Sequence, residues 1–329
     1  MTDKNEVARK FLESLRRFEL AMLIAQCDVS LEVANVDNGF YDEEQTVASI
    51  KAPSPVNEAL SALPQYDVKR LQEAIASAHP LFTKIDKIDV LPSGEIAEGA
   101  SALLAEMIIH REMMIDVATG SKQIQDVNDY YIARSARITE TLPNDIDYIN
   151  PHGDLWAWFH YWKNHFSAYT ERRQYVRTMF GSAIEAISKR SSLAAIKREP
   201  TGWERVDRAL SKARSQLQLA ANEEDFQGVG LLCREAIISL AQAVFDPDIH
   251  ESVDGVTPSL TDANRMLEAY VVHVFPGASY KEVRAHHRAS LALALNLQHR
   301  RTATPQLAEL CLEATASTSA VVSIIARPK

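Results

Sequence analysis

The first helix that the sequence predicts is marked by apolar residues at helical spacing. Phe11, Leu15, Phe18 and Met22 lie three or four positions apart, with charged residues between them. This spacing places all four side chains on one face of a helix. We therefore expect one amphipathic helix over Val7–Ser30.

Further helices follow in the amino-terminal half, and proline or glycine marks several of their ends. Pro80 closes one of them, because the residue before a proline is pushed out of the helical basin, and Gly120 stops another. Asp154 is expected to cap an aromatic helix that leads to a further helix ending near Arg190. The pattern predicts helices over 56–62, 68–78, 96–118, 124–141 and 155–190, the last with a break near 167. The stretch 82–95 is compatible with either a loop or a small hairpin.

A polar and basic stretch separates this half from a second helical region. It ends at Pro200-Thr201-Gly202, and a boundary of this composition is typical of a linker. The pattern after it predicts helices over 203–222, 226–245, 260–274, 279–301 and 305–326. We therefore expect an all-α fold with a helical domain at 1–190, a linker at 191–202 and a four- to five-helix bundle at 203–329.

Composition agrees with a helical, folded chain. Of its 329 residues, 46% are hydrophobic, 24% are charged and only 11 are glycine, so helix propensity is high almost everywhere. The sequence has no signal peptide and no uninterrupted apolar run of the roughly 20 residues that a membrane span needs, so we expect a cytoplasmic protein without a membrane partner. Its three cysteines are far apart and are interpreted as buried thiols.

Charge is distributed unevenly along the chain, whose net charge is −9. Five lysines or arginines, three histidines and only one glutamate lie between Lys281 and Arg301. Arg284, His287 and Arg288 are therefore expected to form an exposed basic face. Such a face suits the phosphates of RNA, but it is equally compatible with contact to solvent alone.

The sequence lacks the readable signatures of common cofactor and hydrolase sites. It has no phosphate-binding glycine loop, no dinucleotide fingerprint and no Gly-x-Ser-x-Gly motif. Neither His160 with His165 nor His286 with His287 has the spacing of a metal pair. We expect no metal and no cofactor.

One candidate binding site combines aromatic and basic residues. Trp156 lies in an aromatic stretch, and Arg172 and Arg173 open the helix after it. Aromatic rings beside guanidinium groups can bind a planar or anionic ligand. Aromatic residues at helical spacing are also typical of a core, and an arginine pair of a solvated surface, so both interpretations stand.

The region 203–327 resembles the HEPN-type helical bundles of bacterial defence and abortive-infection proteins. The resemblance rests on Gly228-Val229-Gly230-Leu231-Leu232-Cys233-Arg234-Glu235-Ala236, on Asn296-Leu297-Gln298-His299-Arg300-Arg301-Thr302-Ala303-Thr304, and on Glu313-Ala314-Thr315. It implies a domain that forms homodimers. It also implies a metal-independent ribonuclease whose arginine precedes a histidine by four to six intervening residues.

The chain departs from that ribonuclease motif. His299 stands for the family's histidine and Asn296 loosely for its polar residue, but Ala292, Leu293 and Ala294 stand where the arginine would be. Arg288 is eleven residues from His299, about 16 Å along a helix, which is too far to share one phosphate with it. A two-fold dimer would double every group and so bring in further arginines.

RNA cleavage needs a proton acceptor or donor near neutrality and a cation for the phosphate. His299 would supply the first, with Arg300 and Arg301 as the cations. The same three residues are also typical of the carboxyl end of a helix, where cations stabilise exposed carbonyls.

Two main functions follow from these patterns, and regulation purely by dimerisation is a third possibility. The first is a bacterial defence protein of the abortive-infection type, whose HEPN-like domain dimerises and binds or cleaves RNA. The alternative is a non-catalytic interaction or sensor module that binds a protein partner or a small ligand. The sequence leaves open whether the chain is an enzyme.

Overall fold

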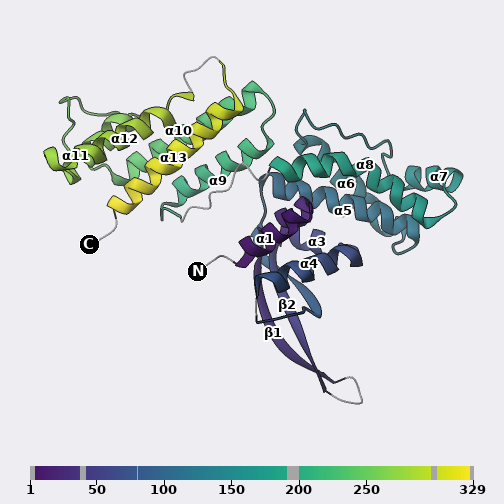
Figure 1. Ribbon diagram of the computed structural model, residues 1–329. Helices are drawn as coiled ribbons and strands as arrows, with labels where there is room; N and C mark the ends of the chain where they lie inside the picture. Colours follow the sequence, from purple (N-terminus) through teal and green to yellow (C-terminus); the bar gives the residue numbers. More distant parts are fainter. Residues whose placement is uncertain (1–3, 38–41, 80, 191–199, 298–301, 327–329) are drawn as a thin grey trace. The chain divides into compact units, whose positions relative to one another are not determined.

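The computed structural model describes residues 4–37, 42–79, 81–190, 200–297 and 302–326 of the chain (Figure 1). It is mostly helical, with one small β-sheet. The chain divides into two compact units, Met1–Leu193 and Ala194–Lys329. Each unit has its own buried core, and each is described here by itself.

The amino-terminal unit contains eight helices and three strands within its described residues. In chain order these are α1 (Lys4–Ser14), α2 (Phe18–Ile24), β1 (Asp28–Asp37), β2 (Asp42–Ser54), α3 (Val56–Ser61), α4 (Gln65–Ala78), β3 (Lys87–Ile96), α5 (Gly99–Thr119), α6 (Ile124–Thr141), α7 (Leu155–His165) and α8 (Tyr169–Arg190).

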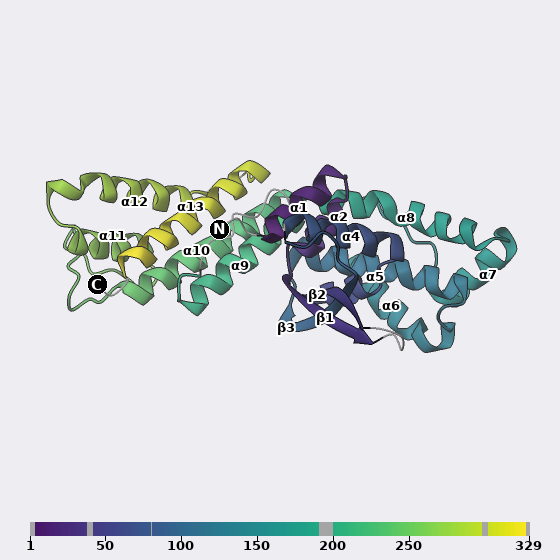
Figure 2. The ribbon, with the colours of Figure 1, turned by 60° about the horizontal axis from the view of Figure 1, so that its bottom comes forward.

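The sheet corrects the all-α prediction. Strands β1 and β2 form an antiparallel hairpin, and β3 lies parallel to β2 on its other side, in the order β1-β2-β3. Figures 1 and 2 show β1 and β2 as a long ribbon that extends from the helices of this unit. The stretch 82–95, expected as a loop or a hairpin, instead contains most of β3, and its partner strand is 40 residues upstream, where Val47 faces Lys87.

The single helix predicted over 7–30 is also wrong. The chain leaves the helical conformation at Arg16, whose φ is 57°, and restarts as α2 before β1 begins at Asp28. In β1, Val29, Leu31 and Val33 alternate with polar residues, and this period of two favours a strand. The prediction extended the helical spacing of the preceding apolar residues and did not take account of the change to a period of two at β1.

Helix α5 is the centre of the amino-terminal unit. Most of its side chains are buried on all sides, because it packs against α3, α6, α7 and α8. It ends at Gly120, whose φ of 82° is the left-handed conformation that glycine adopts without strain. The prediction that Asp154 caps α7 is confirmed, since its carboxylate accepts a hydrogen bond of 2.7 Å from the Ala157 amide.

The carboxyl-terminal unit is built from helices alone within its described residues. They are α9 (Glu204–Leu219), α10 (Glu223–Val244), α11 (Ala263–Val274), the short 3-10 helix η2 (Ala278–Tyr280), α12 (Lys281–Ala294) and α13 (Pro305–Ile325). Helix α10 packs against α9, α11 and α13, and α12 packs against α13. Figure 2 shows α9, α10, α12 and α13 side by side. Helix α12 is shorter than the predicted 279–301, since it ends at Ala294.

Helix α13 is long and apolar enough to cross a membrane by length and composition, with a mean hydropathy of 1.3 over 18 residues. Half of that window is buried inside the unit, where residues such as Ala308, Cys311 and Val322 contribute to the core. A core helix satisfies the same criteria, so this feature does not by itself point to a membrane.

Candidate functional site

The junction between α12 and α13 contains the predicted catalytic residues. His299, Arg300 and Arg301 lie outside the described residues. On one side Leu297 is 2% exposed, and on the other Ala303 is 8% exposed. Both ends of this short connection are therefore fixed in the core.

Gly230 of α10 explains how Leu297 is seated. A Cβ atom at this glycine would lie 3.3 Å from two atoms of the leucine side chain, which is tighter than ordinary packing contact. The absence of a side chain thus lets the chain after α12 approach α10 closely. Asn296, the predicted polar residue of the site, is exposed beside this contact.

A buried thiol joins the last turn of α12 to α13. Cys311 donates a hydrogen bond of 3.0 Å to the carbonyl oxygen of Ala294. The hydrogen bond that it shares with the Cys233 thiol, together with burial, raises the pKa of Cys311. It is therefore protonated at neutral pH and acts as a hydrogen-bond donor within the core.

The predicted basic face of α12 is largely engaged within the unit. The guanidinium group of Arg288 binds both carboxylate oxygens of Glu268, at 2.9 and 3.1 Å from Nε. Arg284 is half-buried and donates a hydrogen bond of 2.6 Å to the carbonyl oxygen of Phe275. Both arginines therefore stabilise the contact between α12 and α11, Arg288 at the middle of α11 and Arg284 at its carboxyl end.

His287 corrects the prediction of an exposed face more strongly. It is 1% exposed, and neither ring nitrogen has a hydrogen-bond partner among the described residues. It shares a helix stripe with Leu291 and Ala294, which both face the core. Burial lowers its pKa, so the ring is neutral at pH 7 and does not contribute a cation to the surface.

The aromatic residues of α7 are mainly packing residues. Trp158 is fully buried, its ring stacks on Tyr175 at 5.4 Å, and its indole donates a 3.0 Å hydrogen bond to the Met114 carbonyl. Trp156, in contrast, is 46% exposed and touches Phe159 edge-on. Of these two tryptophans, only Trp156 is thus open to solvent.

The two predicted arginines of this site differ sharply. The Arg172 guanidinium lies over the rings of Trp162 and Tyr169, at 5.6 and 5.1 Å from their centroids. It donates hydrogen bonds to the carbonyl oxygens of Ala118, at 2.8 Å, and of Phe166. Arg172 therefore caps the carboxyl end of α5, whereas its neighbour Arg173 is exposed.

A buried polar centre in the amino-terminal unit was missed by sequence reasoning. The Asn150 side chain donates a 2.7 Å hydrogen bond to the Tyr131 hydroxyl and lies 3.4 Å from Nε2 of His110. The Tyr131 hydroxyl in turn donates to the carbonyl oxygen of His152, at 2.8 Å. His110 stacks on Tyr131, with ring centroids 4.2 Å apart.

The titratable groups of this centre are held in their neutral forms. Burial, with a smaller contribution from the nearby Arg134, lowers the pKa of His110 to about 3. Burial raises the pKa of Tyr131 to about 12. Both groups are therefore neutral at pH 7, and the centre ties α5, α6 and the chain before α7 together.

Arg134 lies near enough to this centre for its charge to contribute to the lowered pKa of His110. It is 1% exposed, and its guanidinium forms ion pairs with Glu106 and, at 3.1 Å, with Glu58. These residues come from α6, α5 and α3, which are far apart in the sequence. No local pattern marks such a group, because each residue alone is an ordinary charge on a helix.

Metal binding has no geometric support in the part of the chain that the structure describes. No group of three or more histidine, cysteine, aspartate or glutamate side chains is arranged there to hold an ion.

Comparison with protein-family models, with curated proteins and with solved structures finds no match to this chain.

Proposed function

We propose that the protein acts as a cytoplasmic homodimer in bacterial defence and that its HEPN-like carboxyl-terminal unit binds or cleaves RNA. The observation that carries the proposal is the anchored connection between α12 and α13. The buried Leu297 and Ala303 hold a short segment whose sequence contains His299, Arg300 and Arg301.

The chemistry of this segment suits RNA cleavage without a metal. His299 would accept the proton of a 2′-hydroxyl group, whose oxygen attacks the adjacent phosphorus. The 5′-oxygen of the next nucleotide then leaves as a hydroxyl after protonation, and a 2′,3′-cyclic phosphate remains. Arg300 and Arg301 would stabilise the charge on the phosphate, with Asn296 as a further hydrogen-bonding group.

The test is cleavage of a mixed RNA pool in the presence of a metal chelator. We expect fragments from the wild type and a loss of at least 100-fold in rate for His299→Ala, in line with the usual contribution of a general acid or base. His160→Ala is the matched control, since this exposed histidine lies in α7 of the other unit. Absence of cleavage by concentrated wild-type protein would remove the enzymatic part of the proposal.

RNA binding is tested separately from cleavage. Arg300→Ala and Arg301→Ala should each weaken binding and reduce the dependence of log Kd on log salt by about one. Binding with an unchanged salt dependence in both variants contradicts a phosphate contact by these arginines.

A second candidate function is recognition of a protein partner or small ligand by the amino-terminal unit. The observation that favours it is the 46% exposure of Trp156, a residue type common in binding sites. Trp156→Ala and Arg173→Ala should then abolish the protection of α7 and α8 from hydrogen exchange that a bound partner confers. Full protection in both variants would eliminate this site.

A further inference from the structure

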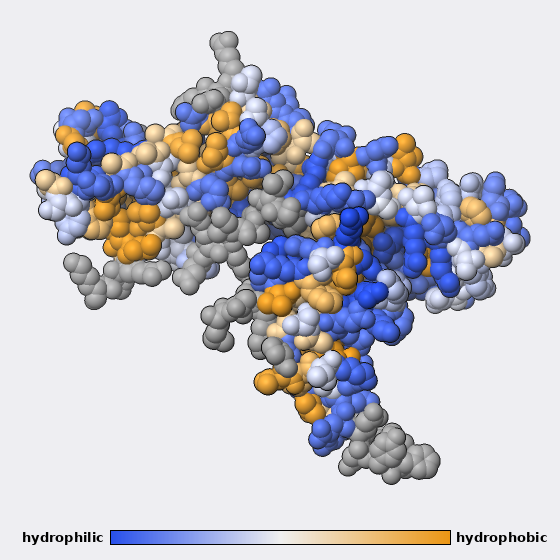
Figure 3. All heavy atoms as spheres, in the orientation of Figure 1, coloured by the Kyte–Doolittle hydropathy of each residue, from blue (hydrophilic) through white to orange (hydrophobic). Residues whose placement is uncertain are grey.

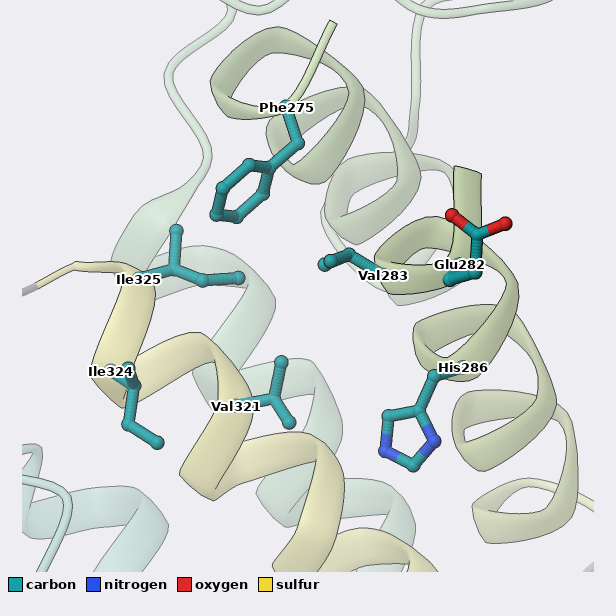
Figure 4. Close-up of a pocket in the computed structure, with 7 residues that line it drawn as sticks. All are labelled: Phe275, Glu282, Val283, His286, Val321, Ile324 and Ile325. Carbon is teal, nitrogen blue, oxygen red and sulfur yellow. The ribbon is translucent and has the colours of Figure 1, made fainter. Parts of the chain in front are cut away.

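An apolar groove lies between the first half of α12 and the last turns of α13. Its floor is formed by Val283 of α12 and by Val321, Ile324 and Ile325 of α13, with Phe275 at one end (Figure 4). The groove contains about 440 Å³ of space. Its position differs from that of the proposed RNA site, because Val283 is eleven residues, or about 16 Å of helix, before the end of α12.

This groove is open to solvent rather than enclosed. Ile324 is 62% exposed, and Phe275, Val283, Val321 and Ile325 are half-buried. Figure 3 shows hydrophobic residues gathered on the surface at the carboxyl-terminal end of α13. Small-molecule sites bury most of their ligand, so an open trough between two helices suits a larger, elongated ligand.

The edge of the groove carries a carboxylate that forms no ion pair with the residues that the structure describes. Glu282 lines the groove together with His286, and both are exposed. No lysine or arginine among the described residues lies within ion-pair distance of Glu282, although Arg288 on the same helix is paired with Glu268. An apolar ligand with a cation at its edge would therefore complement this groove in both shape and charge.

We propose that the groove binds an amphipathic helix of a partner protein, with apolar residues on the floor and a lysine or arginine beside Glu282. A helix presents such a set at positions i, i+3, i+4 and i+7, which matches a trough between two helices. A second copy of the chain is the competing occupant, and the variants described below separate the two.

The proposal is tested with synthetic helical peptides and the full-length protein. One peptide, about 18 residues long, places leucines on one face and lysines on the other. A second has the same composition with the leucines distributed around the helix, and a third replaces lysine by glutamate. Fluorescence anisotropy should show at least tenfold tighter binding of the first peptide than of either control. Equal binding of the two lysine peptides would mean that attraction to the acidic protein explains the signal, and the proposal would fail.

Variants identify the surface that binds. Ile324→Glu should weaken binding of the amphipathic lysine peptide at least tenfold, whereas Leu310→Glu, at a 50% exposed position of α13 outside the groove, should not. Glu282→Lys should reverse the preference toward the glutamate peptide. An unchanged affinity in Ile324→Glu overturns the proposal. The proposal is also overturned if the wild type binds no peptide, sediments as a dimer, and becomes monomeric in Ile324→Glu. The groove would then be an interface with a second copy of the chain.

Discussion

Replacement of Arg134 by methionine should destabilise the amino-terminal unit strongly. The guanidinium is 1% exposed and pairs with Glu106 and Glu58, whose side chains are 20% and 43% exposed. Methionine keeps most of the volume but removes the charge, so Glu106 would remain half-buried without its main partner. Breaking a buried pair costs about 3–5 kcal/mol. Because water can still reach both carboxylates, we expect about 2–4 kcal/mol here.

The same carboxylate provides a matched control. Arg137, one turn further along α6, also pairs with Glu106, at 3.5 Å, but its side chain is 53% exposed. An exposed ion pair contributes about 0–1 kcal/mol, so Arg137→Met should cost no more than that. Both variants remove one positive charge near Glu106, and Arg134→Met also removes the pair with Glu58, so the difference between them measures the contribution of the buried guanidinium with both of its partners.

The assay is unfolding in urea, followed by tryptophan fluorescence. Three of the four tryptophans lie in the amino-terminal unit and only Trp203 lies in the other, so a Trp203→Phe background makes the signal report on one unit. The free energy of unfolding is then compared between Arg134→Met and Arg137→Met at pH 7. Equal losses in the two variants would refute the reasoning, because they would show that burial of the guanidinium adds nothing.

The remaining predictions concern pH, packing and helix capping. The pKa of His110 falls to about 3 on folding, so the unfolded chain binds a proton at this residue at a higher pH than the folded chain does. As the pH decreases from 6.5 toward 3, this residue should therefore lower the free energy of unfolding by about 1.4 kcal/mol per pH unit. His110→Gln should flatten the dependence of the unfolding free energy on pH, and an equal slope in both proteins would contradict the shift. Gly230→Val should destabilise the carboxyl-terminal unit by about 1–3 kcal/mol and slow RNA cleavage, because the valine side chain would collide with the buried Leu297. Thermal unfolding is compared with that of Gly181→Val, a position with open space around it. Arg172→Met should cost about 2 kcal/mol through loss of its carbonyl and ring contacts, whereas Arg173→Met should change the unfolding free energy by less than about 0.5 kcal/mol; similar values for the two would exclude the capping role.

Local sequence patterns predict the helices and many of their ends. The stripes of apolar residues and the breaks at Gly120 and Asp154 depend on local conformational preference, which each short segment carries with it. Most of the predicted helices therefore lie close to the observed ones. The first predicted helix was wrong because the chain turns at Arg16. This non-glycine residue adopts the left-handed conformation, which its residue type does not predict.

The pairing of the strands and the protonation states of the buried histidines depend on contacts between distant segments. Strand β3 needs β2 as its partner, and the neutral states of His110 and His287 follow from burial by helices distant in sequence. Strand pairing and desolvation are properties of contacts between segments, and a local pattern does not contain them. The same reason applies to Arg172 and Arg284. The sequence predicts both as ligand-binding cations, but in the folded chain each donates hydrogen bonds to backbone carbonyl oxygens.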